Sequence, residues 1–169
     1  SRASGKLSAC NVHVAPGLGN AMGAIYAAKF ANTPIIITAG QQELGHGLTE
    51  PLLYDSLVPM AEPLVKWAVE VTRLQDLPRI VRRAAKIAMT PPMGPVFISL
   101  PGDILNEEDA LELGSRTRIQ TKVCPTEETL NALADRMIEA KNPVILVGHE
   151  IATDRAFEEA GNIADVLGC

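Results

Sequence analysis

The segment Asn11-Val12-His13-Val14-Ala15-Pro16-Gly17-Leu18-Gly19-Asn20-Ala21-Met22-Gly23 decides the fold of this chain. The apolar run from Leu7 to Val14 predicts a buried strand with His13 at its carboxyl end. Pro16-Gly17 predicts a turn, and alanine-rich sequence with helical spacing predicts a helix from Gly19 to Ala31. In parallel α/β domains, a strand followed by a glycine-rich turn and a helix is a common ligand-binding arrangement.

The glycines of this segment indicate a close approach of backbone to another group. Gly17, Gly19 and Gly23 have no side chains where a ligand or a neighbouring strand would need the space. The free N–H groups at the start of the predicted helix carry partial positive charge. We expect them to face the same space as His13.

The rest of the first hundred residues alternates between strand and helix patterns. Apolar runs predict strands over 33–40, 64–69 and 95–100, and a helix over 77–89. Strands that are apolar on both faces are typical of a parallel sheet covered by helices. Residues 41–63 are rich in glycine and proline, which predicts a loop with one helix near 50–58. The fold class is therefore α/β, with a parallel sheet flanked by helices.

A change in composition divides the chain. Residues 1–105 form the first predicted domain, and the polar segment 106–125 predicts a linker. Residues 126–169 predict a helix over 126–140, a strand over 142–148 and a helix over 153–167, the start of a second, doubly wound α/β domain. One strand with two helices cannot bury a core of its own, so we expect this chain to be a piece of a longer enzyme.

Composition excludes several classes of partner. The 15 basic and 20 acidic side chains give a formal net charge of −5, and there is no basic cluster, so nucleic acid and membrane surfaces are poor partners. The three cysteines are far apart, and no run is apolar enough for a signal peptide or a membrane span. We expect a cytoplasmic protein that acts on a small molecule.

Several segments of the chain carry a resemblance to a known family. They are Asn11-Val12-His13, Gly17 to Ala24, Thr38-Ala39-Gly40-Gln41-Gln42, Pro63 to Trp67 and Gly94 to Pro101. In order and spacing they resemble the thiamine diphosphate-dependent 2-keto acid decarboxylase and acetolactate synthase family, closest to the benzoylformate decarboxylases. The resemblance covers about 1–105 and continues more loosely to Cys169.

The resemblance implies a domain identity, cofactors and an assembly. Residues 1–105 would be the C-terminal part of the pyrimidine-binding domain, and 126–169 the start of the central domain. The cofactors would be thiamine diphosphate and Mg²⁺, and the substrate a 2-keto acid. Because the cofactor lies between two subunits in this family, a homodimer or tetramer is expected.

The resemblance also assigns roles to individual residues. His13 matches the active-site histidine beside the reacting carbon, and an imidazole that titrates near neutrality suits proton transfer. Synthases more often carry glutamine at this position, which favours a decarboxylase. The remaining assignments are Gly17, Gly19 and Asn20 at the cofactor and Leu52 and Leu53 at the substrate.

No metal ligand is expected in this chain. Gly102-Asp103 is similar to the start of the family's Gly-Asp-Gly motif, but Ile104 breaks the motif and Asn131 falls within a predicted helix. We therefore expect the Mg²⁺ ligands, and the glutamate that activates the cofactor, to lie outside this chain. We expect no catalysis by this segment alone.

Each assignment has a structural alternative. His13 could be a hydrogen-bonded structural histidine, Asn20 an ordinary residue near a helix N-terminus, and Leu52 with Leu53 part of the core. A nicotinamide-binding domain is a poorer match, because Gly17-Leu18-Gly19 is followed by Gly23, one residue too late. An acetolactate synthase-like carboligase and a noncatalytic relative that serves in assembly remain as further alternatives.

Overall fold

The computed structural model describes residue 1 and residues 3–115 and 123–169. It divides into two compact units, Ser1–Thr121 and Lys122–Cys169, which we treat separately. The part of the predicted linker 106–125 that spans 116–122 lies outside the described residues. In the described ranges no helix has the length and hydropathy needed to cross a membrane.

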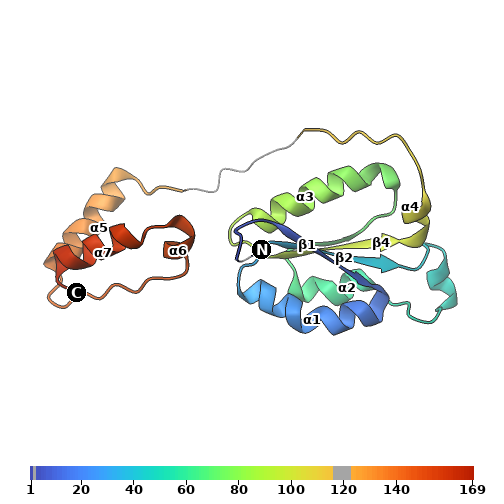
Figure 1. Cartoon of the computed structure of the whole chain (residues 1–169), viewed down its shortest axis with the longest axis horizontal. Helices are drawn as coiled ribbons and strands as arrows, with labels where there is room; N and C mark the ends of the chain where they lie inside the picture. The colour runs from blue at the N-terminus through green and yellow to red at the C-terminus, as the bar shows by residue number, and fades with distance from the viewer. Residues whose placement is uncertain (2, 116–122) are drawn as a thin grey trace. The chain divides into compact units, whose positions relative to one another are not determined.

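The first unit is a parallel sheet between two layers of helices (Figure 1). In its described part the four strands are β1 (Ser8–His13), β2 (Ile35–Gln41), β3 (Ala68–Glu70) and β4 (Pro95–Pro101), in the order β1-β2-β4-β3. Its helices are α1 (Val14–Phe30), α2 (Leu57–Ala61), α3 (Leu77–Met89) and α4 (Gly102–Asn106). Helices α1 and α2 cover one face of the sheet and α3 covers the other. The predicted fold class is confirmed.

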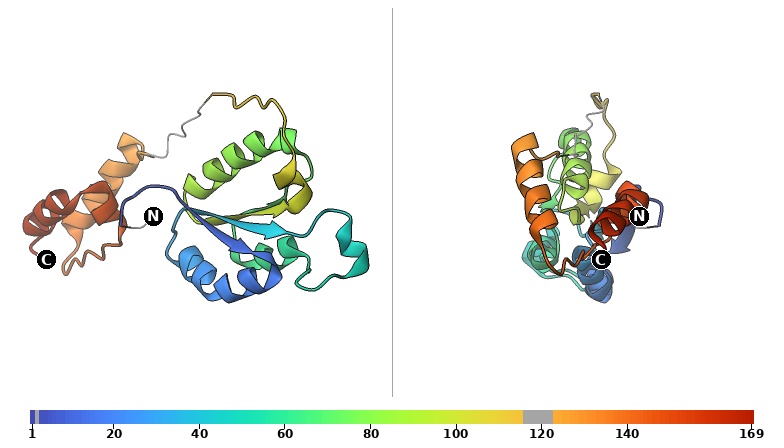
Figure 2. Two further views of the ribbon diagram at one scale, coloured as in Figure 1. Left: turned by 45° about the vertical axis from the view of Figure 1, so that its right-hand side comes forward. Right: turned by 90° about the vertical axis from the view of Figure 1, so that its left-hand side faces the viewer.

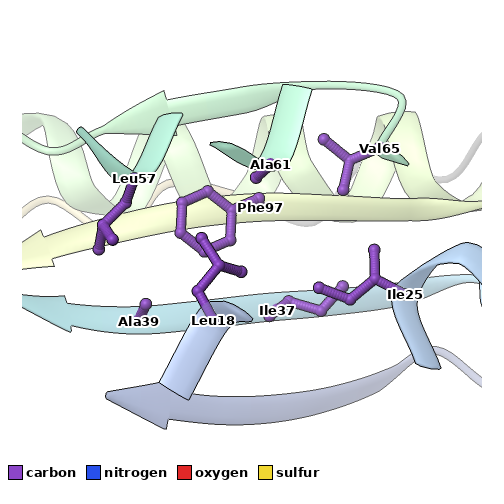
Figure 3. Packing of buried hydrophobic residues seen from close by; sticks show 8 residues of the cluster. All are labelled: Leu18, Ile25, Ile37, Ala39, Leu57, Ala61, Val65 and Phe97. Carbon is purple, nitrogen blue, oxygen red and sulfur yellow. The ribbon is translucent and has the colours of Figure 1, made fainter. Parts of the chain in front are cut away.

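The central strands β2 and β4 supply the core on both faces. Figure 3 shows Ile37 and Phe97 packed against side chains of α1 and α2, including Leu18 and Leu57. The neighbouring residues on the same strands, Ile36, Val96 and Ile98, pack in a second cluster with the buried alanines of α3. Alternate residues of a strand point to opposite faces, so a strand covered on both faces is apolar throughout.

The strand register brings the carboxyl ends of the strands to one edge. His13 of β1 is paired with Gly40 of β2, and Gly40 is paired with Leu100 of β4. Figure 2 shows the segment between β2 and α2 extending from the arrowhead end of β2. Loops at this edge of a parallel sheet are the usual place for ligand binding, and this edge is the candidate site.

The junction between β1 and α1 differs from the prediction. The helix begins at Val14, directly after the strand, so the predicted turn at Pro16-Gly17 is wrong. Val14 reverses the chain in a single residue by adopting a φ of 49°. Pro16 fits inside the first turn because the N–H groups there have no helical acceptor.

Two further boundaries also differ. The predicted strand 64–69 is observed as β3 at Ala68–Glu70, because Pro63 lies in a 3-10 turn over Glu62–Leu64. The helix predicted near 50–58 is observed as α2 at Leu57–Ala61. Glu50 and Leu53 both have positive φ, a conformation that a right-handed helix excludes.

The second unit contains α5 (Glu127–Glu139), α6 (Glu150–Asp154) and α7 (Phe157–Leu167). Thr126 caps α5, since its hydroxyl accepts a hydrogen bond from the Thr129 N–H at 3.3 Å. The predicted strand 142–148 is not formed, and Leu146 is 97% exposed. A strand requires a neighbour to satisfy its N–H and C=O groups, and the described part of this unit offers none. The helix predicted over 153–167 is interrupted at Arg155, whose φ is 57°.

A buried and an exposed phenylalanine, Phe97 and Phe30, allow the contribution of the core to stability to be tested. Phe97 is fully buried, whereas Phe30 is 78% exposed. We expect Phe97→Ala to lower the free energy of unfolding by about 3–5 kcal/mol, because it leaves a cavity in the central strand. Phe30→Ala should change it by no more than about 0.5 kcal/mol. Urea unfolding measures both, and equal losses would contradict the packing described.

Candidate active site

His13 lies at the carboxyl edge of the sheet, where β1 ends and α1 begins. It is exposed, its backbone is extended, and it is the N-cap residue of α1. Within the described ranges its imidazole takes part in no side-chain hydrogen bond or salt bridge. The imidazole is therefore available to a ligand.

The residue that follows His13 is strained. Val14 is β-branched and buried, yet it has a φ of 49°, a left-handed conformation that non-glycine residues rarely adopt. Such a conformation costs about 1–3 kcal/mol, and strain of this kind clusters at functional sites. Here it allows the strand to pass directly into α1, so that His13 and the helix N-terminus lie at the same edge.

The predicted cofactor residues lie in the first turns of α1. Gly19 and Asn20 are exposed, and a Cβ added to Gly19 would have no atom within 4 Å. Gly17 instead faces β1, since a Cβ there would lie 3.6 Å from Val12 Cβ. The open, uncharged surface at Gly19 and Asn20 fits the approach of a cofactor. The roles of all three residues stay predictions.

The loop after β2 is held against this edge by Gln41. The side-chain amide of Gln41 donates a hydrogen bond to the Asp55 carbonyl and accepts one from the Gln42 N–H, each at 2.8 Å. The Ala15 N–H, in the first turn of α1, donates to the Leu53 carbonyl at 3.4 Å. These contacts fix the end of the loop beside the residues that follow His13.

Leu52 and Leu53 lie on this fixed part of the loop. They are 85% and 45% exposed, so neither is an ordinary core residue. Leu53 also has a φ of 74°, an unusual conformation for a large side chain. The structure therefore brings Leu53 close to the start of α1 and leaves apolar side chains exposed at the same edge as His13. Their contact with a substrate stays a prediction.

Sequence reasoning missed the part that Gln41 plays. A glutamine that ends a strand of apolar residues is a signal of a buried polar contact, since Gln41 is itself buried. In the sequence, Gln41 is noted only as part of the segment Thr38 to Gln42 that resembles the family. What the sequence does not reveal is the acceptor, because the carbonyl of Asp55 is brought within reach only by the folded loop.

In the ranges 3–115 and 123–169, the remaining polar groups do not assemble into a second centre. Asp103 accepts a hydrogen bond from the Leu44 N–H at 3.3 Å. His46 lies 3.8 Å from a carboxylate oxygen of Glu43. The described residues contain no group of three or more histidine, cysteine, aspartate or glutamate side chains placed to hold a metal ion.

The lysine with a perturbed pKa lies away from the candidate site. Burial lowers the pKa of Lys66, which precedes β3. Its Nζ donates hydrogen bonds to the carbonyls of Ile87 and Thr90, each at 2.6 Å. These carbonyls belong to the end of α3, so Lys66 acts as a C-terminal cap of that helix.

Comparisons with known proteins agree with this geometry. Residues 1–52 match the family model described as thiamine pyrophosphate enzyme, N-terminal TPP binding domain, where TPP is thiamine diphosphate. The chain is 32% identical to benzoylformate decarboxylase from Pseudomonas aeruginosa, over 98% of this chain and 32% of that protein. It is 28% identical to the acetolactate synthase isozyme 3 large subunit from Escherichia coli, over 98% of this chain and 30% of that protein.

A solved structure shows the same fold. The crystal structure of benzoylformate decarboxylase from Polynucleobacter necessarius superimposes with a TM-score of 0.86 and 36% identity, over 97% of this chain and 31% of that one. The chain thus spans about a third of the length of the relatives that it matches. The matching domain model over residues 1–52, the sequence similarity and the shared fold show that this chain is similar to thiamine pyrophosphate enzymes, among them benzoylformate decarboxylases and acetolactate synthases.

Proposed function

We propose that the protein containing this chain decarboxylates an aryl 2-keto acid without oxidation, using thiamine diphosphate. The observation that carries the proposal is the exposed His13 imidazole, which has no partner in the described residues and shares an edge of the sheet with Leu52 and Leu53. The benzoylformate decarboxylases among its relatives support the substrate class.

The residues of this chain would position the substrate and move a proton. Thiamine diphosphate, when bound, supplies an electron sink for the carbon left by the departing carboxylate. His13 would hold and transfer the proton at that carbon, a task suited to an imidazole. Its Nδ1 is the ring nitrogen nearer Gly40 of β2, and we assign the transfer to Nε2. Leu52 and Leu53 would surround the aryl group and exclude water from it.

The proposal extends to the cofactors and the assembly. Gly17, Gly19 and Asn20 would border thiamine diphosphate, with the open surface at Gly19 giving it room. Mg²⁺ would be held by residues other than those described here. Such a centre requires a second subunit in this family, so we propose a homodimer or tetramer. We also propose that the protein is located in the cytoplasm.

A carboligase of the acetolactate synthase type is the second candidate. The similarity to the Escherichia coli synthase extends over nearly the whole chain. Both reactions begin with decarboxylation of a 2-keto acid and differ in whether a proton or a second carbonyl compound is taken up. A histidine at position 13 favours the proton, because an imidazole can donate one. Product analysis after incubation with pyruvate or benzoylformate separates the two.

The role of His13 is tested by His13→Ala in the full-length product of the gene. Loss of a general acid or base should reduce kcat by about 10²- to 10⁴-fold, with a much smaller change in the Kd for thiamine diphosphate. The control is His46→Ala, because the His46 side chain is 56% exposed and lies in the loop near Glu43. Steady-state kinetics and cofactor titration measure both. An unchanged kcat in His13→Ala would remove His13 from the reaction.

The substrate class is tested by Leu52→Ala. Loss of an apolar side chain from the substrate pocket should reduce kcat/KM for benzoylformate by at least about 10-fold, since a single missing methylene in such a contact costs about 1–3 kcal/mol and Leu52→Ala removes three carbon atoms. The value for pyruvate, which has only a methyl group, should change far less. Val81→Ala, at a 42% exposed residue of α3 on the other face of the sheet, is the control. Equal losses for the two substrates would contradict a substrate contact.

A further inference from the structure

We propose that Gly40 is a positioning residue, whose missing side chain provides the space in which the His13 imidazole lies. The inference rests on the proposed function, because it gives a reason for holding the imidazole in one place. It concerns a residue for which the sequence predicted no role. The evidence is the geometry between the ends of β1 and β2.

The two residues are direct neighbours across the sheet. His13 and Gly40 are paired in the parallel register of β1 and β2. A Cβ added to Gly40 would lie 2.9 Å from His13 Nδ1 and 3.5 Å from His13 Cε1. The shorter distance is below any ordinary contact between a carbon and a nitrogen atom, so any side chain at position 40 would collide with the imidazole.

The backbone conformation at position 40 does not require a glycine. Gly40 has no positive φ, so residues with side chains could adopt its conformation. Glycine inside a strand is unfavourable, because it loses more conformational freedom on folding and contributes no packing. When a strand glycine is not required by the backbone, a close approach by another group is the usual reason. In this structure that group is the imidazole of His13.

The collision would displace the histidine rather than the strand. Position 40 lies between the fully buried Ala39 and the buried Gln41, whose side chain is hydrogen-bonded on both sides. His13 is exposed and has no hydrogen bond in the described residues that would resist movement of its side chain. A methyl group on Gly40 would therefore rotate the imidazole away and move its nitrogens from the place where they would meet the substrate.

The test combines Gly40→Ala with His13→Ala in the full-length product of the gene. Gly40→Ala alone should reduce kcat by roughly 10- to 100-fold, as expected for a misplaced reacting group, with a smaller change in KM. In the His13→Ala background it should cause no further loss. Gly161→Ala is the control, because a Cβ there has no atom within 4 Å and lies in the other unit. It should leave kcat unchanged.

Two measurements without cofactor make the inference independent of activity. In ¹H–¹³C NMR spectra, Gly40→Ala should shift the imidazole signals of His13 and leave those of His46 and His149 in place. Any loss of Tm in Gly40→Ala should be recovered on adding His13→Ala, because the collision is with the imidazole. If Gly40→Ala alone folds poorly, the double variant should fold again, so the test still gives a result.

The outcomes separate this inference from the proposed function. Unchanged His13 signals, or equal losses of Tm in the two backgrounds, would overturn the positioning role of Gly40. If instead His13→Ala leaves kcat unchanged while Gly40→Ala still shifts the His13 signals, the positioning holds and the proposed function fails.

Discussion

The parallel pairing of β1, β2 and β4 is the constraint on which the candidate site depends. It places residues from three distant parts of the chain, His13, Gly40 and Leu100, in one row at the carboxyl edge of the sheet. The row is rigid because β2 and β4 are buried between α1 and α2 on one face and α3 on the other. A reacting group on such a base is held more accurately than one on a free loop.

Strain and polar contacts then give the edge its particular shape. The unfavourable conformations of Val14 and Leu53 are sustained by the packed sheet and by the hydrogen bond from Ala15 to Leu53. Gln41 adds a buried polar contact that fixes the loop. The edge thus combines a free imidazole, exposed apolar side chains and the N-terminus of a long helix.

Much of this arrangement could be predicted from the sequence, where the signals are local. The apolar runs of β2 and β4 and the helix α3, bounded by Asp76 and Pro91, indicate their elements clearly. The position of His13 at a strand end follows from the same periodicity. The family resemblance added the identity of the domain, which periodicity alone could not supply.

The remaining features depend on contacts between distant residues. Pro16-Gly17 was predicted as a turn because the sequence does not reveal that Val14 reverses the chain alone. The segment 142–148 has the apolar sequence of a strand, but in the described residues no strand lies beside it. Strand propensity alone therefore could not predict whether this segment forms a strand. The sequence predicts no role for Gly40, because the imidazole that lies against it belongs to the neighbouring strand. Only the pairing of β1 with β2 brings the two residues together.

The most direct test of the central claim, that the edge at His13 faces the cofactor, is a titration followed by NMR. Thiamine diphosphate and Mg²⁺ are added to the full-length product of the gene, and the imidazole signals of its histidines are recorded. The account predicts saturable shifts of the His13 signals and none of the His149 signals. Saturable cofactor binding with unchanged His13 signals would contradict it.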